Sequence, residues 1–456
     1  MEGSSTILTA QDLLEKYNVP APRYTSYPTV PFWQQKPPAE QDWFQVVDAC
    51  LKESDEISVY IHLPFCERLC TYCGCNTKIT QKHAVELPYI ETLLKEWQLY
   101  TKRFLKKPIL KELHLGGGTP TFFSPENLKV LLNQILATVE VPENHDFGFE
   151  AHPNSTSKEH LTVLKALGFN RISVGVQDFN PRILQVINRI QTEEQIEFVT
   201  QQARKLGYES VNYDIIYGLP LQKVEDIQCS IEKIKTLKPD RIAFYSYAHV
   251  PWVKKGQRAY AESDLPSPQE KRELYEFGKK ALIAMGYQEI GLDHFALPTD
   301  SLYQATQSKE LHRNFMGYTP LKSNLLIGLG ASAISEAGRA YIQNEKQVSA
   351  YQAAIGNEQL SIFRGHLLTD EDYFIKNAIA SIMCHKQLEW KIIPDNYEQE
   401  VRTLLQEMEQ DGIIQMDERQ LIVTEKGFPF LRNISMAFDW RLKRKNTSEQ
   451  LFSKAI

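Results

Sequence analysis

Short apolar runs alternate with longer amphipathic segments from about residue 57 to residue 285. Six short runs predict strands, at 57–63, 112–115, 146–150, 171–177, 211–218 and 241–247, and the first, ISVYIHL, is rich in β-branched and aromatic residues. Each is followed by a segment that predicts a helix, which indicates a parallel sheet with right-handed crossovers, either open or closed. Because polar residues and glycines gather where the strands end, we expect an α/β fold with an incomplete, TIM-like (βα)6 barrel.

Polar residues that can cap helices mark where several of the predicted helices begin. Ser124, Thr192 and Ser267 each precede an amphipathic segment and predict helix N-caps. Thr156, with Glu159 three residues later, predicts a further capping box. The predicted helices therefore start close to the ends of the predicted strands, as short crossovers require.

Composition divides the chain into three regions. We expect an N-terminal extension, a partial barrel and a mostly helical C-terminal domain, at 1–50, 51–345 and 346–456. The stretch PRYTSYPTVPFW (22–33) is rich in proline and aromatic residues and predicts an extended segment pinned to the rest. GIIQMDERQLIVTEKG (412–427) predicts a hairpin after a helix, which resembles a winged helix. No basic recognition helix accompanies it, which favours packing or substrate cover over DNA binding.

Composition and charge narrow the classes of function. The 456 residues are 42% hydrophobic and carry a net charge of −6, whereas proteins that bind nucleic acid or anionic membranes are usually basic. No apolar run approaches the ~18 residues of a membrane span, and the first residues lack the features of a signal peptide. We therefore expect a cytoplasmic protein with no nucleic-acid or membrane partner.

Four of the seven cysteines lie within ten positions, in HLPFCERLCTYCGCN (62–76). Seven thiols cannot all pair within one chain, and disulfides are rare in a reducing compartment, so this group indicates a metal or redox site. The spacing is Cys66-x3-Cys70-x2-Cys73-x-Cys75. The first three could share one face of a short helix, although thiols are an unusual choice for packing.

Zinc and an iron–sulfur cluster are the two other interpretations of the cysteine loop. Zinc takes four ligands, usually in two separated pairs, and the extra ligand here would be Cys75, His62 or His83. Three thiolates in a short loop can instead hold a [4Fe–4S] cluster and leave one iron open. An open position is useful only where another molecule binds the metal, as in catalytic metal sites.

C-x3-C-x2-C at the end of the first strand of such a barrel resembles the radical S-adenosylmethionine (SAM) superfamily. The whole chain resembles one family within it, the oxygen-independent coproporphyrinogen III oxidases. The matching stretches are PRYTSYPT (22–29), VYIHLPFCERLCTYCGCN (59–76), GGGTPT (116–121), GFNRISVGVQDFN (168–180), VINR (186–189), YDIIYGLP (213–220), DRIAFYSYAHVP (240–251), DHFA (293–296), LHRNFMGYT (311–319) and ASAIS (331–335). A match spread over so many segments is far more specific than the cysteine spacing.

The resemblance implies one [4Fe–4S] cluster on Cys66, Cys70 and Cys73, with SAM chelating the open iron. Cys75 is not a ligand in the family, and it is a possible catalytic residue. In the family one electron cleaves SAM to a 5′-deoxyadenosyl radical, which removes a hydrogen from a substrate propionate. Loss of CO2 and one electron leaves a vinyl group. Two such reactions convert coproporphyrinogen III to protoporphyrinogen IX in haem biosynthesis.

The resemblance also implies which residues bind SAM. They are Tyr60, Tyr72, Gly117, Gly118, Thr119, Glu150, Gln177, Arg189, Asp214, Ala248 and Ile334. A second SAM molecule is implied beside the first, near Tyr72, Gly118 and Thr119. The chain departs from the family pattern after Glu150, where AHP (151–153) replaces a Val-Asp-Pro type of sequence.

The substrate carries four propionates, which an acidic protein must meet with a few placed cations. Arg23 in the N-terminal stretch and Arg313 in LHRNF are the candidates. An electron donor is required but cannot be identified from the sequence, and the resemblance implies a monomer. The alternative function is that of a haem chaperone of the same superfamily, without decarboxylase activity. Such chaperones lack a cysteine at the place of Cys75 and lack PRYTSYPT, so the enzyme is favoured.

Overall fold

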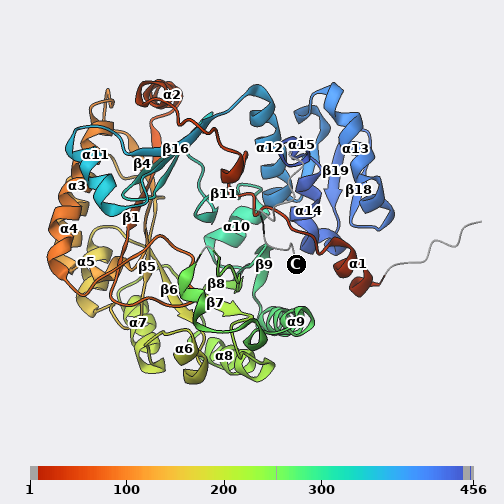
Figure 1. The fold of residues 1–456 in the computed structure, drawn as a ribbon, viewed down its shortest axis with the longest axis horizontal. Helices are drawn as coiled ribbons and strands as arrows, with labels where there is room; N and C mark the ends of the chain where they lie inside the picture. Colours follow the sequence, from red (N-terminus) through yellow and green to blue (C-terminus); the bar gives the residue numbers. More distant parts are fainter. Residues whose placement is uncertain (1–8, 253, 445–451, 453–456) are drawn as a thin grey trace, which may run out of the picture.

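A twelve-stranded sheet forms the centre of the molecule (Figure 1). The computed structural model describes residues 9–252, 254–444 and 452, so residues 1–8 of the predicted N-terminal extension and most of 445–456 lie outside the described residues. Six parallel strands lie side by side in chain order: β1 (Glu56–Leu63), β4 (Ile109–Gly117), β5 (Asp146–Ala151), β6 (Arg171–Gln177), β7 (Ser210–Tyr217) and β8 (Arg241–Ser246). The α/β class and the six parallel strands are therefore confirmed.

Further strands extend the sheet on both sides of the six. Beyond β1 lie β13 (Leu325–Leu329), β14 (Ile334–Ala337), β15 (Ala340–Asn344) and β16 (Ile362–Leu367). Beyond β8 lie β10 (His294–Ala296) and β9 (Gln288–Gly291). Of these strands only β13 pairs in parallel, with β1, and the other pairs are antiparallel. Short turns join β9 to β10, β13 to β14 and β14 to β15, and such turns favour antiparallel pairing. The sheet is thus mostly parallel at its centre and antiparallel at its edges.

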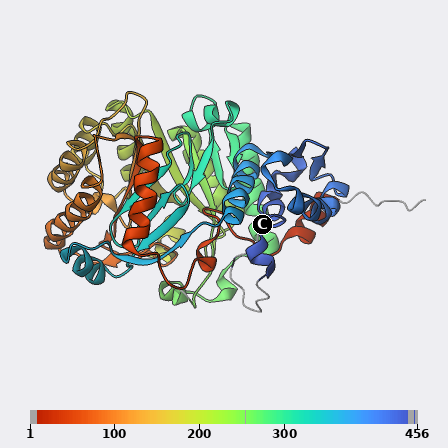
Figure 2. The same ribbon diagram turned by 90° about the horizontal axis from the view of Figure 1, so that it is seen from above.

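One layer of helices covers the outer face of the central strands (Figure 1 and Figure 2). It is made of α3 (Glu86–Thr101), α4 (Pro125–Leu136), α5 (Lys158–Ala166), α6 (Pro181–Val186), α7 (Glu193–Lys205), α8 (Val224–Leu237) and α9 (Pro268–Ala284). The predicted caps Ser124, Thr192 and Ser267 are confirmed. The predicted cap Thr156 is wrong, because Ser157 caps α5 and Thr156 is buried with its hydroxyl on the carbonyl of His152.

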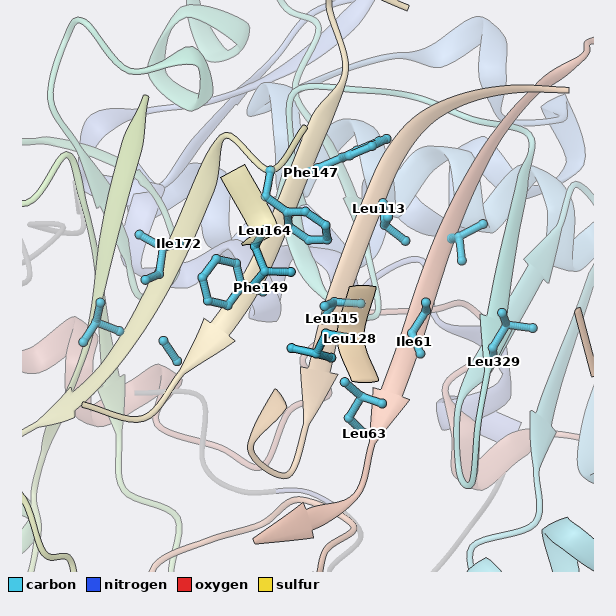
Figure 3. Close-up of a cluster of buried hydrophobic side chains, with 14 of the residues drawn as sticks. Ile61, Leu63, Leu113, Leu115, Leu128, Phe147, Phe149, Leu164, Ile172 and Leu329 are labelled. Atoms are coloured by element: carbon cyan, nitrogen blue, oxygen red, sulfur yellow. The ribbon is translucent and has the colours of Figure 1, made fainter. Parts of the chain in front are cut away.

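Alternate residues of the central strands pack against this helix layer. Ile61, Leu63, Leu113, Leu115, Phe147 and Phe149 point toward Leu128 of α4 and Leu164 of α5 (Figure 3). Each of these side chains is fully buried. Because side chains alternate across a strand, the residues between them face the other side of the sheet, which we call the inner face.

The N-terminal stretch packs against the C-terminal helices. Before it, α1 (Ala10–Tyr17) contacts the same region through a hydrogen bond from the Tyr17 hydroxyl to Asp411. Tyr24 and Tyr27 are buried, and Arg432 donates hydrogen bonds to the carbonyls of residues 21 and 22. The stretch is therefore pinned as predicted, but it is bent at 25–28 rather than extended because its buried tyrosines turn into this core.

The region after β15 is mostly helical, as predicted, and most of it lies at the end of the molecule away from α3 and α4 (Figure 1). Its helices are α11 (Val348–Gly356), α12 (Asp370–His385), α13 (Asp395–Gln410), α14 (Leu431–Met436) and α15 (Trp440–Arg444). The predicted hairpin is present as β18 (Ile414–Met416) and β19 (Gln420–Val423), and β17 (Gln387–Glu389) pairs with β19. Strand β16 of this region belongs to the main sheet.

The remaining elements are short, apart from one long helix near the N-terminus. They are α2 (Glu40–Glu53), α10 (Ser301–Gln307), β2 (Phe65–Cys66), β3 (Lys78–Ile79), β11 (His312–Asn314) and β12 (Gly317–Thr319). Across the described parts of the chain, no helix combines the length and the apolar composition needed to span a bilayer.

Candidate active site

The cysteine loop follows β1 directly and is not helical. Residues 67–77 contain only turns, bends and irregular backbone, so the helix-packing interpretation of the cysteines is wrong. Thr119 donates a hydrogen bond to the sulfur of Cys66, at 3.3 Å, and Nη1 of Arg189 lies 3.6 Å from the sulfur of Cys70. These two contacts tie the thiols to β4 and to the segment after β6.

Neighbouring groups set the proton affinities of the thiols. The hydrogen bond between Cys73 and Cys75 lowers the pKa of Cys73 to about 6 and raises that of Cys75, while burial raises the pKa of Cys66 to about 11. Several thiols in one loop form a donor set that fits a [4Fe–4S] cluster. Among the residues that the structure describes, no three His, Cys, Asp or Glu side chains are already arranged to hold a single metal ion.

His62 fixes the loop from the inner face of β1. Its Nε2 lies 2.9 Å from the carbonyl oxygen of Asn76, and its Nδ1 lies 3.0 Å from the hydroxyl of Tyr60. Burial lowers the pKa of His62, so the neutral ring donates from Nε2 and accepts at Nδ1. Sequence reasoning considered His62 only as a zinc ligand and missed this positioning role.

The glycine run at the end of β4 is required by close packing within the chain. Gly117 has a φ of +111°, and a Cβ at this position would overlap the ring of His62. A Cβ on Gly118 would lie 2.6 Å from the backbone of Pro64, just before the cysteine loop. The glycines therefore let the end of β4 lie close beside the end of β1 and the start of the cysteine loop, and they leave the Gly117 N–H available to a polar partner.

Carboxylates from neighbouring strands meet on the inner face. Glu150 of β5 accepts a hydrogen bond from the Gly117 N–H at 3.1 Å. Asp214 of β7 accepts hydrogen bonds from Ser173 and Asn212 at 3.1 and 2.9 Å. Burial, with the negative charge of Glu150, raises the pKa of Asp214 to about 7. Two carboxyl groups thus lie close together, which suits hydrogen bonding to hydroxyl and amino groups of a ligand.

Gln177 and Arg189 complete this edge of the sheet. Gln177 is buried at the end of β6 and has a φ of +67°, a conformation that is uncommon for a residue with a side chain and is often found at functional sites. Arg189 donates to the hydroxyl of Tyr72 at 3.4 Å and to Gln191 at 2.7 Å. A buried guanidinium is therefore held beside the thiols, with the planar donors that a carboxylate ligand requires.

Comparison with known proteins identifies the family. The model of the radical SAM superfamily matches residues 60–234. The chain is 36% identical to the oxygen-independent coproporphyrinogen III oxidase of Pseudomonas aeruginosa, over 99% of each chain, and 36% identical to that of Escherichia coli, over 97% of this chain and 98% of the relative. The chain belongs to the oxygen-independent coproporphyrinogen III oxidase family. The solved coproporphyrinogen III oxidase from Escherichia coli, described as a radical SAM enzyme, has a TM-score of 0.88 at 35% identity, covering 92% of this chain and 97% of that one.

Most residues that this family resemblance predicted come together in the structure. Thr119 contacts Cys66, Gly117 contacts Glu150, and Arg189 contacts both Tyr72 and Cys70, as given above. Ala248 is linked to the cysteine loop through Gln257, whose amide donates to the carbonyls of Ala248 and Tyr72 at 3.1 and 3.2 Å. Ile334 begins β14, and its carbonyl packs against Gly328, which is paired with Tyr60 of β1.

The two predicted substrate arginines contact groups outside the cysteine loop. Arg23 forms an ion pair with Asp293 at 2.9 Å. Arg313 lies on β11 and stacks on Tyr318. Two residues further on, Phe315 packs edge-on against Tyr60 with ring centres 5.1 Å apart. The β11–β12 hairpin thus reaches the inner face of the sheet, which no local feature of the sequence indicated.

The departure from the family pattern after Glu150 has a local explanation. Nδ1 of His152 accepts a hydrogen bond from the backbone N–H of Asn154 at 3.2 Å. An aspartate can bond the N–H two residues later in the same way. Burial lowers the pKa of His152 well below its usual value, so a neutral imidazole takes the place of the carboxylate in this family member.

Proposed function

We propose that the protein catalyses the oxygen-independent oxidative decarboxylation of coproporphyrinogen III. Two propionate side chains become vinyl groups, and the product is protoporphyrinogen IX, in haem biosynthesis. The observation that carries this proposal is the agreement over nearly the whole chain with coproporphyrinogen III oxidases, together with thiols at the end of β1 beside a polar inner face. A full-length match matters because the cysteine spacing alone does not specify the reaction.

The cysteine loop holds one [4Fe–4S] cluster through Cys66, Cys70 and Cys73. Cys75 is not a ligand in this proposal, and its hydrogen bond to Cys73 gives it a supporting role. When bound, the cluster and SAM supply the 5′-deoxyadenosyl radical that takes hydrogen from a propionate. The chain's own contribution is to fix the loop through His62 and Thr119 and to keep the thiols next to the cation of Arg189.

SAM binds along the inner face, between the cysteine loop and the edge formed by β5, β6 and β7. Its carboxylate suits the guanidinium of Arg189, and its amino and ribose hydroxyl groups suit Glu150, Gln177 and Asp214. The apolar contacts come from Tyr60, with Ala248 and Ile334 at the two sides. A second SAM binds near Tyr72, Gly118 and Thr119.

We further infer the architecture that surrounds this site. The six central strands form an incomplete (βα)6 barrel in residues 51–345, supported by the parallel order of the strands and the single helix layer on their outer face. Residues 1–50 form an extension, and residues 346–456 form a mostly helical, winged-helix-like domain that serves in packing or in covering the substrate. The enzyme acts as a cytoplasmic monomer and receives electrons from a separate donor, and its seven free thiols suit a reducing compartment.

An anaerobic assay tests the proposed function. Reconstituted protein is mixed with SAM, a reductant and coproporphyrinogen III, and the products are separated. We expect protoporphyrinogen IX and CO2, with SAM consumed as methionine and 5′-deoxyadenosine. Haem binding and transfer without decarboxylation would instead indicate the chaperone and would refute the enzyme.

A further inference from the structure

The two candidate substrate arginines differ in whether their charge is already balanced. Nη1 of Arg23 is 2.9 Å from the carboxylate of Asp293, and 41% of the Arg23 side chain is exposed. Arg313 forms no ion pair with any described residue, and its buried Nε and Nη1 have no hydrogen-bond partner among the described residues. A cation with unsatisfied buried donors is costly, so an oxygen-rich anion is the expected partner of Arg313.

A second buried polar atom without a described partner belongs to the ring of His294, which packs against the same tyrosine as Arg313. Nδ1 of His294 is buried and has no partner within the described part of the chain. The guanidinium of Arg313 lies 4.9 Å from the ring centre of Tyr318, and the ring of His294 meets the same tyrosine edge-on at 5.6 Å. Burial lowers the pKa of His294 to about 4, so its ring is neutral near pH 7 and has one N–H to donate.

The backbone around Tyr318 holds both groups in place. The Tyr318 hydroxyl donates to the carbonyl of Met383 on α12 at 3.2 Å, and a Cβ on Gly291 would overlap that hydroxyl. The neighbouring Gly317 has a φ of +130°, which only glycine adopts easily. The hairpin that carries Arg313 is therefore anchored to α12 through Tyr318.

This arrangement adjoins the inner face where SAM is proposed to bind. The ring of Tyr245 on β8 packs edge-on against His294 at 5.7 Å. Burial, and then the charges on Asp214, Asp293 and Glu150, raise the pKa of Tyr245, so its ring lies near the carboxylate edge as well as against His294. Phe315 of the hairpin contacts Tyr60, as described above. Ring contacts therefore connect the element that carries Arg313 to both Tyr60 and the carboxylate edge of the inner face.

We propose that Arg313 and His294 together bind one propionate carboxylate of the substrate, and that Arg23, already neutralised by Asp293, does not. The inference rests on the proposed function and names the residues that anchor its substrate. A carboxylate on either edge of the guanidinium would satisfy one of the two free donors of Arg313, and its second oxygen would accept the N–H of His294. No bond is made or broken, so the role is one of binding and orientation.

Binding of coproporphyrin III, the oxidised fluorescent form of the substrate, tests the proposal without turnover. Reconstituted wild-type protein is compared with Arg313→Gln, His294→Phe and Arg23→Gln. Arg313→Gln removes a charge-assisted hydrogen bond and should bind coproporphyrin III about 10- to 100-fold more weakly. His294→Phe keeps the ring packing but removes one N–H donor, so its affinity should fall several-fold. Arg23→Gln should bind within about twofold of wild type. Arg339→Gln, at a surface ion pair with Asp370, is the matched control.

The tetramethyl ester of coproporphyrin III, which has no carboxylates, separates a carboxylate contact from a general loss of shape. We expect Arg313→Gln to bind the ester as wild type does, and an equal loss for acid and ester would overturn the proposal. If Arg313→Gln loses iron or unfolds, Arg313→Lys replaces it, and unchanged affinity for the acid in that variant would also overturn it. If the wild-type protein does not decarboxylate the substrate, the proposed function is refuted. If it does, and the Arg313 variants bind coproporphyrin III as tightly as wild type, only this inference is refuted.

Discussion

Glu96 is a buried carboxylate whose ionisation should control stability. It lies on α3 and has no solvent exposure. Its two oxygens accept hydrogen bonds from the Gly330 N–H at 2.8 Å, from the Asn344 amide at 2.6 Å and from the Tyr351 hydroxyl at 2.6 Å. Through these bonds it holds the turn between β13 and β14, and therefore the start of the strand that carries Ile334. We predict that Glu96→Gln removes a pH dependence of folding stability.

The magnitude follows from the shift in proton affinity. Burial raises the pKa of Glu96 from 4.5 to about 7, although its hydrogen bonds oppose this change. Between these two values the folded protein keeps a proton that the unfolded chain has released. Stability must therefore fall as pH rises through this window, and it levels off above about pH 7. At about 1.4 kcal/mol for each pH unit, the loss approaches about 3 kcal/mol.

Urea unfolding of the protein without its cluster, at pH 4.5 and pH 8, measures the effect. Glutamine is neutral at both values, so the stability of Glu96→Gln relative to wild type should rise by about 3 kcal/mol between them. Other buried carboxylates with raised pKa, such as Glu112, are present in both proteins and cancel. Glu91→Gln, at an exposed position on the same helix, should stay within about 0.5 kcal/mol of wild type. Parallel pH curves for Glu96→Gln and wild type would refute the reasoning.

Three further variants probe the cysteine loop and its packing against β4, and a fourth is a control. Cys66→Ala should abolish the iron–sulfur absorbance and turnover, and an unchanged iron content would contradict its role as a ligand. Cys75→Ser should keep the iron but reduce decarboxylation, so loss of iron would make Cys75 a ligand. Gly118→Ala places a Cβ 2.6 Å from the backbone of Pro64 and should cost about 1–3 kcal/mol in urea unfolding. Gly356→Ala, with nothing within 4 Å, should be neutral or slightly stabilising, and equal midpoints for the two variants would argue against the packing explanation.

The central sheet was predictable because each strand carries its own signal. Runs such as 171–177 combine β-branched residues with helix caps nearby, and these local preferences agree with the final packing. The antiparallel edges were not predicted, since β9, β10 and β14 are only three or four residues long. Strands this short are defined by pairing with distant neighbours rather than by composition.

The wrong helix-cap prediction at α5 also arises from contacts that the local sequence does not show. Thr156 and Ser157 are adjacent hydroxyl residues, and either can cap a helix. The side chain of His160, three residues after Ser157, accepts the second hydrogen bond of the capping box from the Ser157 N–H. The usual sequence pattern of a capping box has Glu or Gln at this position and not His. The Thr156 hydroxyl instead forms hydrogen bonds to the carbonyl of His152 and to the hydroxyl of Thr121, so it does not cap the helix. The choice between the two caps is thus made by contacts outside the helix.

The site shows most clearly what folding adds to the sequence. Arg23 and Arg313 are both arginines in family-like stretches, and nothing in their local sequence separates them. The fold brings Asp293 to Arg23 and leaves the buried donors of Arg313 without a partner among the described residues. The proposal that Arg313 rather than Arg23 binds a substrate carboxylate rests on this difference, because an unpaired buried guanidinium gains more from an anionic ligand than one that already has an ion-pair partner. The residues that suit an anionic ligand are thus distinguished by which charges the folded chain leaves unpaired, and their sequence alone does not show it.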